Sequence, residues 1–299
     1  MGDIKLFKIS NRVEELVSHS AKLERELQVS VERNMEAFFG VRFIQTEYTT
    51  THGGRIDSLG LDEDNCPVIF EYKRSSSENV INQGLFYLDW LMDHKASFQL
   101  LVNDTLGKED SEAIDWSLPR LICIAKDFSR YDEYAVKQIN RNIDLVRYKY
   151  FGHDLLLFEL VHANTEKRRS IATDAGKSSN RSYDKTFEEK LEGSSPFVKE
   201  TYQEISDFIM SLGDDIQEKQ LKLYVAFKKI KNFACVEVYQ RKVVIYLKLD
   251  IEADDLIDGF TRDVSQIGHF GTGNFEVSIK SKDDYEKAKW FVQRSYEQT

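Results

Sequence analysis

The stretch 53–74, GGRIDSLGLDEDNCPVIFEYKR, constrains the fold of this chain more than any other. Two strand-like runs, 55–61 and 67–73, flank a short polar segment, and this order predicts a β-hairpin. With the turn centred between the two runs, Asp57 on the first strand faces Glu71 on the second. Directly opposed residues in a hairpin have Cβ atoms roughly 4.5–5.5 Å apart, and like charges at that distance are destabilising. The hairpin therefore holds two carboxylates that need a compensating partner.

The same face of the hairpin also carries two cations. Residues two apart on a strand share a face, so Arg55 lies beside Asp57 and Lys73 beside Glu71. A shared proton, a divalent cation or these neighbouring cations would stabilise the carboxylates, and oxygen ligands favour a hard ion such as Mg²⁺ or Mn²⁺. The competing interpretation is a surface salt-bridge cluster. The apolar run 68–70 counts against it, because such a strand is buried on both faces and only its charged end projects from the core.

Asp57, thirteen intervening residues and then Glu71-Tyr72-Lys73 resemble the Asp…Glu-x-Lys signature of the PD-(D/E)XK nuclease superfamily. The Gly-Arg-Ile-Asp lead-in is most similar to the RecB-like nuclease domain of the NucS/EndoMS group. The resemblance covers roughly the first half of the chain. It implies a restriction-endonuclease-like core, a mixed central β-sheet flanked by helices. It also implies that Asp57 and Glu71 bind Mg²⁺ (or Mn²⁺), that Lys73 is catalytic, and that Arg55 contacts a substrate phosphate.

Two predicted helices add further candidates through the same resemblance. Glu24, on a helix predicted over 13–39, corresponds to an acidic residue that reaches toward the metal. Gln83 and Tyr87, on a helix predicted over 79–93, match a Gln-x-x-x-Tyr element in which the Gln borders the metal site and the Tyr touches the substrate backbone. These two side chains share one helix face because they lie four residues apart. The competing interpretations are a solvated-face charge for Glu24 and an amphipathic core helix for the pair.

The favoured function is a metal-dependent nuclease that hydrolyses phosphodiester bonds. DNA is favoured over RNA because the resembling group acts on DNA. Two alternatives stay open: a catalytically silent nucleic-acid-binding or regulatory protein, and a protein-interaction or ligand-sensing role led by the second half of the chain. A net charge of −10 argues against a nucleic-acid binder, although binding depends on a local patch.

The chain departs from the mismatch-cleaving group in its domain order. That group places a dimerising, DNA-binding domain before its nuclease domain, whereas here the nuclease-like half comes first. Neither mismatch specificity nor a dimer is therefore carried over, and a homodimer is left open.

The length of 299 residues allows two domains. We predict a nuclease-like domain over 1–162, a linker over 163–185, and a smaller C-terminal α+β domain of unknown function over 186–299. No apolar run approaches the roughly 20 residues of a membrane span, so we expect no membrane partner. Three isolated cysteines predict a reducing, cytoplasmic compartment.

The remaining patterns predict an alternation of strands and helices, which is typical of an α/β or α+β fold. In the first half we predict a strand over 41–48, a helix or loop-plus-helix over 96–107, a strand over 121–125, a helix over 131–142 and a hairpin of strands 144–150 and 154–160. In the second half we predict helices over 196–212, 261–265 and 283–296, and strands over 222–228, 233–239, 243–250 and 275–280.

Overall fold

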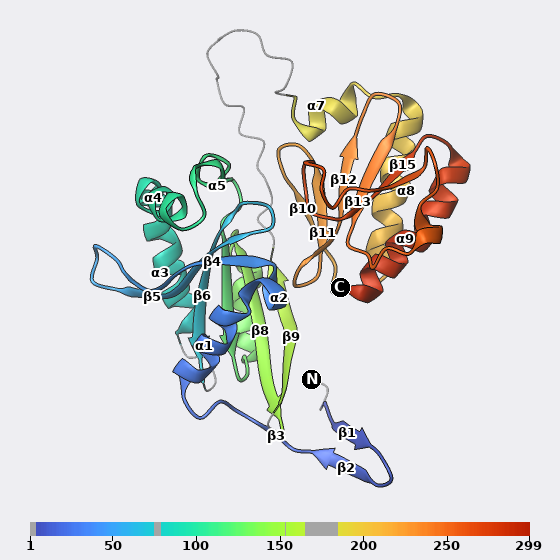
Figure 1. The fold of residues 1–299 in the computed structure, drawn as a ribbon. Helices are drawn as coiled ribbons and strands as arrows, with labels where there is room; N and C mark the ends of the chain where they lie inside the picture. Colours follow the sequence, from blue (N-terminus) through green and yellow to red (C-terminus); the bar gives the residue numbers. More distant parts are fainter. Residues whose placement is uncertain (1–3, 75–78, 153, 165–184) are drawn as a thin grey trace. The chain divides into compact units, whose positions relative to one another are not determined.

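The computed structural model describes residues 4–74, 79–152, 154–164 and 185–299. The chain divides into two compact units, Met1–Glu166 and Lys167–Thr299, which are described separately below (Figure 1). The predicted boundaries, 1–162 and 186–299, lie close to this division. Almost all of the predicted linker, 163–185, lies outside the described residues.

The N-terminal unit is built on a seven-stranded mixed sheet. Its strands follow the order β3-β8-β7-β6-β5-β4, and β9 pairs with β8. The central neighbours β6, β7 and β8 run parallel, whereas β4, β5 and β6 form an antiparallel meander. The prediction of a mixed central sheet is therefore confirmed. The strands are β3 (Ser18–His19), β4 (Val41–Thr49), β5 (Arg55–Asp62), β6 (Pro67–Lys73), β7 (Arg120–Ala125), β8 (Asn142–Phe151) and β9 (Leu155–Asn164).

Helices cover both faces of this sheet (Figure 1). Ile69 of β6 belongs to the apolar cluster that includes helix α3, whereas the ring of the next residue, Phe70, contacts Phe39 of α2. Successive residues of a strand point to opposite faces, so β6 is buried on both sides, as its continuous apolar run predicts. The helices are α1 (Glu24–Arg33), α2 (Met35–Phe39), α3 (Val80–Asp93), α4 (Lys95–Thr105), α5 (Lys108–Glu112) and α6 (Arg130–Gln138).

The helix predicted over 13–39 is wrong in its first part. The chain there forms a small hairpin, β1 (Leu6–Ile9) with β2 (Val13–Leu16), followed by the short strand β3, and the helix begins only at Glu24. The reason is tertiary: β3 pairs with β8, more than a hundred residues further along the chain. A local periodicity carries no information about such a partner.

The C-terminal unit is a six-stranded antiparallel sheet in the order β10-β11-β12-β13-β15-β14, with helices α8 and α9 packed against its apolar face. The helix predicted over 261–265 is wrong, because these residues begin with a three-residue edge strand that pairs with β15. The elements are α7 (Phe187–Glu192), α8 (Pro196–Ser211), β10 (Gln217–Gln220), β11 (Val225–Lys228), β12 (Asn232–Val238), β13 (Val243–Leu247), η1 (Ala253–Asp255), β14 (Thr261–Asp263), β15 (Phe275–Ile279) and α9 (Lys282–Gln298).

Both units fit the predicted α+β class. Within the described part of the chain, no helix combines the length and the apolar character that crossing a membrane requires.

Candidate active site

The β5–β6 hairpin has the register that its sequence predicts. Leu59 pairs with Ile69, and the ladder extends from the turn to Ser58 opposite Phe70. The turn itself is ordered by the carboxylate of Asp62, which accepts hydrogen bonds from two backbone N–H groups of the turn at 3.0 and 2.8 Å. A register set by this turn and by the apolar face leaves no freedom for a one-residue slip. The position of Asp57 relative to Glu71 follows from it.

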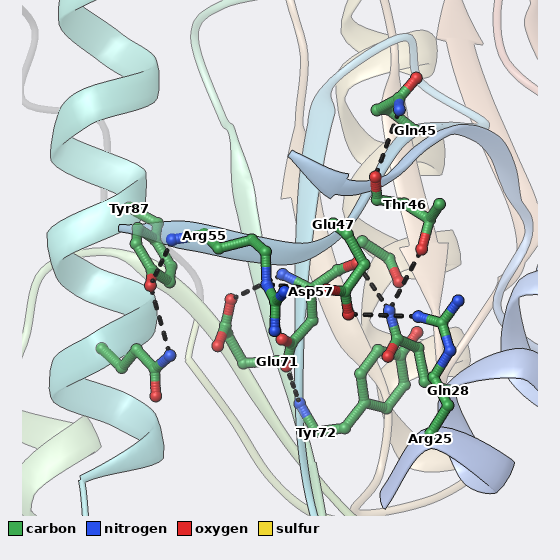
Figure 2. Close-up of polar contacts among 12 residues, drawn as sticks. Arg25, Gln28, Gln45, Thr46, Glu47, Arg55, Asp57, Glu71, Tyr72 and Tyr87 are labelled. Atoms are coloured by element: carbon green, nitrogen blue, oxygen red, sulfur yellow. Dashed lines mark hydrogen bonds and ion pairs between the residues drawn. The ribbon is translucent and has the colours of Figure 1, made fainter. Parts of the chain in front are cut away.

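Asp57 and Glu71 lie side by side just beyond the last backbone pair of the hairpin (Figure 2). The Asp57 N–H donates to Glu71 Oε1 at 3.3 Å, and the Tyr72 N–H donates to Asp57 Oδ2 at 3.0 Å. Each strand thus contributes one carboxylate and one backbone donor. The predicted pairing of the two carboxylates is present in the structure.

The Glu71 carboxylate lies in an unfavourable place for a charge. It is fully buried, and its Oε2 has no hydrogen-bond partner among the described residues. Burial, followed by the neighbouring charge of Asp57, raises the pKa of Glu71 to about 9. Burial also raises the pKa of Asp57, against the opposing effects of the Tyr72 N–H and the Lys73 charge. At neutral pH and without a bound cation, the pair therefore retains a proton.

Lys73 lies at the end of β6, on the same strand face as Glu71. Its Nζ is 3.6 Å from Glu24 Oε1, and the other oxygen of Glu24 accepts the Arg74 N–H at 3.0 Å. Glu24, the first residue of α1, is therefore bound to the end of β6. Within the described ranges, no three or more His, Cys, Asp or Glu side chains group as metal ligands. The structure thus brings Glu24 to Lys73 and does not place it in a three-carboxylate group with Asp57 and Glu71.

Gln83 and Tyr87 share one face of α3, as their spacing predicts. The Tyr87 hydroxyl accepts hydrogen bonds from the Arg55 N–H at 3.0 Å and from Gln83 Nε2 at 3.3 Å. The Tyr87 ring is only 5% exposed, and a Cβ atom on Gly54 would lie 2.5 Å from it. In this arrangement Tyr87 positions the start of β5, immediately before Asp57. Its predicted contact with a substrate backbone stays a prediction.

The structure adds Glu47, which sequence reasoning missed. Glu47 Oε2 pairs with Arg55 Nε at 2.7 Å and Oε1 with Arg25 Nη1 at 3.1 Å (Figure 2). Its backbone has φ of 53°, which is uncommon for a residue other than glycine. The Glu47 charge also raises the pKa of Asp57. No local pattern in the sequence distinguishes Glu47, because its partners come from α1 and β5.

Gln28 of α1 is a second residue that the sequence did not indicate. Its side chain is buried, and Nε2 donates to the Asp57 carbonyl oxygen at 2.9 Å. It thereby ties the strand that carries Asp57 to the helix on the opposite side of the sheet from α3. Gln28 follows Glu24 by four residues, so α1 supplies both from adjacent turns.

The donor set defines what the site can bind. Asp57 and Glu71 offer only oxygen atoms, one of which is buried and has no hydrogen-bond partner among the described residues, and the Lys73 charge acts on both carboxyl groups. Oxygen ligands of this kind fit a hard divalent cation, whereas soft metals favour sulfur or imidazole ligands. Asp57 and Glu71 are thus the residues that could hold such an ion.

Residues 187–299 match a family described as a domain of unknown function, DUF5655, in agreement with the predicted C-terminal domain. An uncharacterized protein from Haemophilus influenzae is 28% identical over 280 residues, which cover 90% of this chain and 91% of that protein.

Two solved structures resemble part of the chain. One is a repair endonuclease from Pyrococcus abyssi, with 18% identity over 43% of this chain and 49% of that chain, at a TM-score of 0.30. The other is described as an EndoMS–dsDNA complex, with 14% identity over 48% of this chain and 64% of that chain, also at a TM-score of 0.30. The match spans less than two thirds of either chain.

Proposed function

We propose that this chain is a metal-dependent nuclease of the PD-(D/E)XK type that hydrolyses phosphodiester bonds, with DNA as the favoured substrate. One observation carries the proposal: the fully buried Glu71 has an unpartnered oxygen, among the described residues, directly beside the carboxylate of Asp57. Keeping such a group ionised is costly unless a cation compensates it. Strongly perturbed carboxyl groups of this kind cluster at functional sites.

Asp57 and Glu71 are the proposed ligands of Mg²⁺ (or Mn²⁺). When bound there, the ion would polarise the scissile phosphate and lower the pKa of an attacking water. The Glu24 carboxylate already contacts the Lys73 ammonium at 3.6 Å and the Arg74 N–H at 3.0 Å. The proposed metal ligands are therefore Asp57 and Glu71, and Glu24 is a less favoured third ligand.

Lys73 is the proposed catalytic cation. Its side chain is 28% exposed, so it can meet a substrate while Glu24 orients it. Burial raises the pKa of both Asp57 and Glu71, and the Lys73 charge opposes this rise, which supports its assignment to the same site. A fixed cation here would orient the attacking water and stabilise the negative charge that develops on the phosphate.

Arg55 and Gln83 are the proposed positioning groups for the substrate and the water. The Arg55 side chain is 64% exposed and is paired with Glu47, so a substrate phosphate would compete with that carboxylate. Gln83 Nε2 donates to the Tyr87 hydroxyl, which also accepts the Arg55 N–H, and this contact supports its assignment to the site. We propose that Gln83 positions the attacking water or Lys73, and that Tyr87 holds the backbone of β5.

The test is cleavage of single-stranded, duplex and branched DNA with Mg²⁺ or Mn²⁺. We compare the wild type with Asp57→Ala and Lys73→Ala, and use the exposed residues Asp104→Ala and Lys108→Ala as matched controls. Loss of cleavage in the first two variants alone supports the proposal. No cleavage by the wild type, with no metal binding by calorimetry, would overturn it.

One observation favours the alternative of a catalytically silent, nucleic-acid-binding or regulatory protein. No third carboxylate joins Asp57 and Glu71 within the part of the chain that the structure describes. The alternative predicts that the wild type binds DNA without cutting it, and that Asp57→Ala binds equally well. A homodimer, which the sequence left open, is not part of the proposal.

A further inference from the structure

The C-terminal sheet has a second face that its helices do not cover. Helices α8 and α9 pack on the face that carries Ile245 and Val277. The alternate residues point the other way, and the strand registers align four of them in one row across four strands. Cys235 pairs with Tyr246, Tyr246 with Glu276, and Glu276 with Arg262. We call this the polar face.

The polar face carries a connected set of hydrogen bonds. Glu276 is only 8% exposed and accepts bonds from Arg262 Nη2 at 2.5 Å and from Ser278 Oγ at 3.3 Å. The Tyr246 ring stacks on His269 with centroids 4.1 Å apart, so the segment after β14 folds over part of the face. The Glu276 charge is therefore already compensated by Arg262.

Two lysines on this face are opposed to each other. The last pair of the ladder is Val243 with Ile279, and Lys242 and Lys280 are the next residues outward, so they continue this register just beyond the ends of β13 and β15. Like charges in directly opposed positions are destabilising. This is the cationic counterpart of the carboxylate pair in the N-terminal unit.

Neither lysine is neutralised by a carboxylate. Lys242 Nζ donates to Ser278 Oγ at 3.4 Å, and Lys280 Nζ donates to the Gly259 carbonyl at 2.9 Å. Within the described residues, neither ammonium lies within the 4.0 Å that defines an ion pair with Asp or Glu. Lys242 Nζ also lies over the Tyr239 ring, 5.2 Å from its centroid, so the contacts of both charges named here are with neutral groups. An anion between the two lysines would relieve their repulsion.

A cavity of about 370 Å³ lies at this place. Lys242, Lys280 and Arg262 line it together with Glu276 and the exposed Asp258, so three cations stand against two carboxylates. Its volume falls within the roughly 300–1,000 Å³ that is typical of small-molecule sites. The cavity therefore has the size for a small anion or nucleotide and an excess of positive charge.

We propose that this cavity of the C-terminal domain is a binding site for a phosphate group. Free phosphate or a phosphate monoester carries about two negative charges, enough to balance both lysines, whereas a backbone phosphodiester balances one of them. The acceptor oxygens of either group match two ammonium groups and the guanidinium of Arg262. The phosphate belongs to a free ion, a mononucleotide or a nucleic-acid backbone. The proposal does not depend on the nuclease function proposed above.

The test is isothermal calorimetry on the full chain in a metal chelator at constant ionic strength. The probes are inorganic phosphate, AMP and a short single-stranded oligonucleotide. The test variant is Lys242→Gln/Lys280→Gln. The matched control, Lys199→Gln/Lys287→Gln, removes two exposed lysines from helices α8 and α9. Removal of opposed like charges should leave the Tm unchanged or slightly higher, so a thermal melt verifies folding.

The expected result is that the wild type binds at least one probe and the test variant binds it at least about tenfold more weakly, because two charge-assisted hydrogen bonds to the phosphate are lost. The control should bind as the wild type does. Tightest binding of phosphate, AMP or the oligonucleotide identifies the source of the phosphate group. The proposal is overturned if no probe binds, if the test variant binds like the wild type, or if the control weakens equally.

Discussion

Glu71→Gln is expected to make the N-terminal unit more stable at neutral pH and to remove most of its pH dependence in a metal chelator. Glu71 is fully buried, and its pKa is raised from 4.5 to about 9. The folded state therefore holds a proton that the unfolded chain releases. Stability is largest below the unfolded pKa of 4.5 and falls as the pH rises toward 9.

The size of the effect follows from this shift. Each pH unit between the two pKa values costs about 1.4 kcal/mol of the free energy of unfolding. Three units, up to about pH 7.5, amount to about 4 kcal/mol. The glutamine amide cannot ionise and avoids this cost, but its NH₂ group takes the place of the unpartnered oxygen and loses about 1–3 kcal/mol as an unsatisfied donor. The net gain in stability at neutral pH is therefore about 1–3 kcal/mol.

The assay is urea unfolding at several pH values in a chelator, followed by tryptophan fluorescence. A Trp290→Phe background leaves Trp90 and Trp116, which both lie in the N-terminal unit, as the reporters. Glu36→Gln, at an exposed position on α2, is the matched control. Equal slopes of stability against pH for Glu71→Gln and its parent between about pH 5 and 8, or a changed slope in the control alone, would contradict this prediction.

Three further predictions test the same site. Binding of Mg²⁺ near pH 7.5 should release about one proton from the wild type and markedly less from Glu71→Gln, because a ligand must be deprotonated; calorimetry in two buffers of different ionisation enthalpy measures this, and equal release by both proteins contradicts it. Tyr87→Phe should destabilise the N-terminal unit by about 1–2 kcal/mol, since the Arg55 N–H loses its acceptor; Tyr131→Phe, on an exposed side chain, should change nothing, and equal urea midpoints for both would disprove the positioning role. Gly54→Ala should destabilise by about 1–3 kcal/mol through overpacking against the Tyr87 ring, with a control in Tyr87→Leu, where the smaller side chain should reduce the penalty in a double-mutant cycle.

The local pattern alone was enough for the elements that carry the candidate site. The alternation of 55–61, the polar turn and the continuous apolar run before Glu71 predicted the hairpin, and the structure has the same register. Spacing along α3 placed Gln83 and Tyr87 on one face, where a hydrogen bond now joins them. These features depend only on strand and helix periods, which a short stretch of sequence contains.

Tertiary structure decided what surrounds the hairpin. The segment predicted as the start of a long helix is extended instead, because β3 pairs with β8. Glu47 forms ion pairs with Arg25 and Arg55, and Glu24 forms one with Lys73. Each of these pairs joins elements that are separate in the sequence.

The same contrast holds in the C-terminal unit. The apolar alternation of β12, β13 and β15 marked the strands, but the three-residue β14 exists only because β15 lies beside it. The opposed lysines Lys242 and Lys280 likewise became neighbours through a pairing of strands distant in sequence. Periodicity along a chain determines which side of each element is apolar, whereas charge pairs and edge strands depend on which elements meet. Which elements pack together is determined by burial of the whole core, to which all the elements contribute.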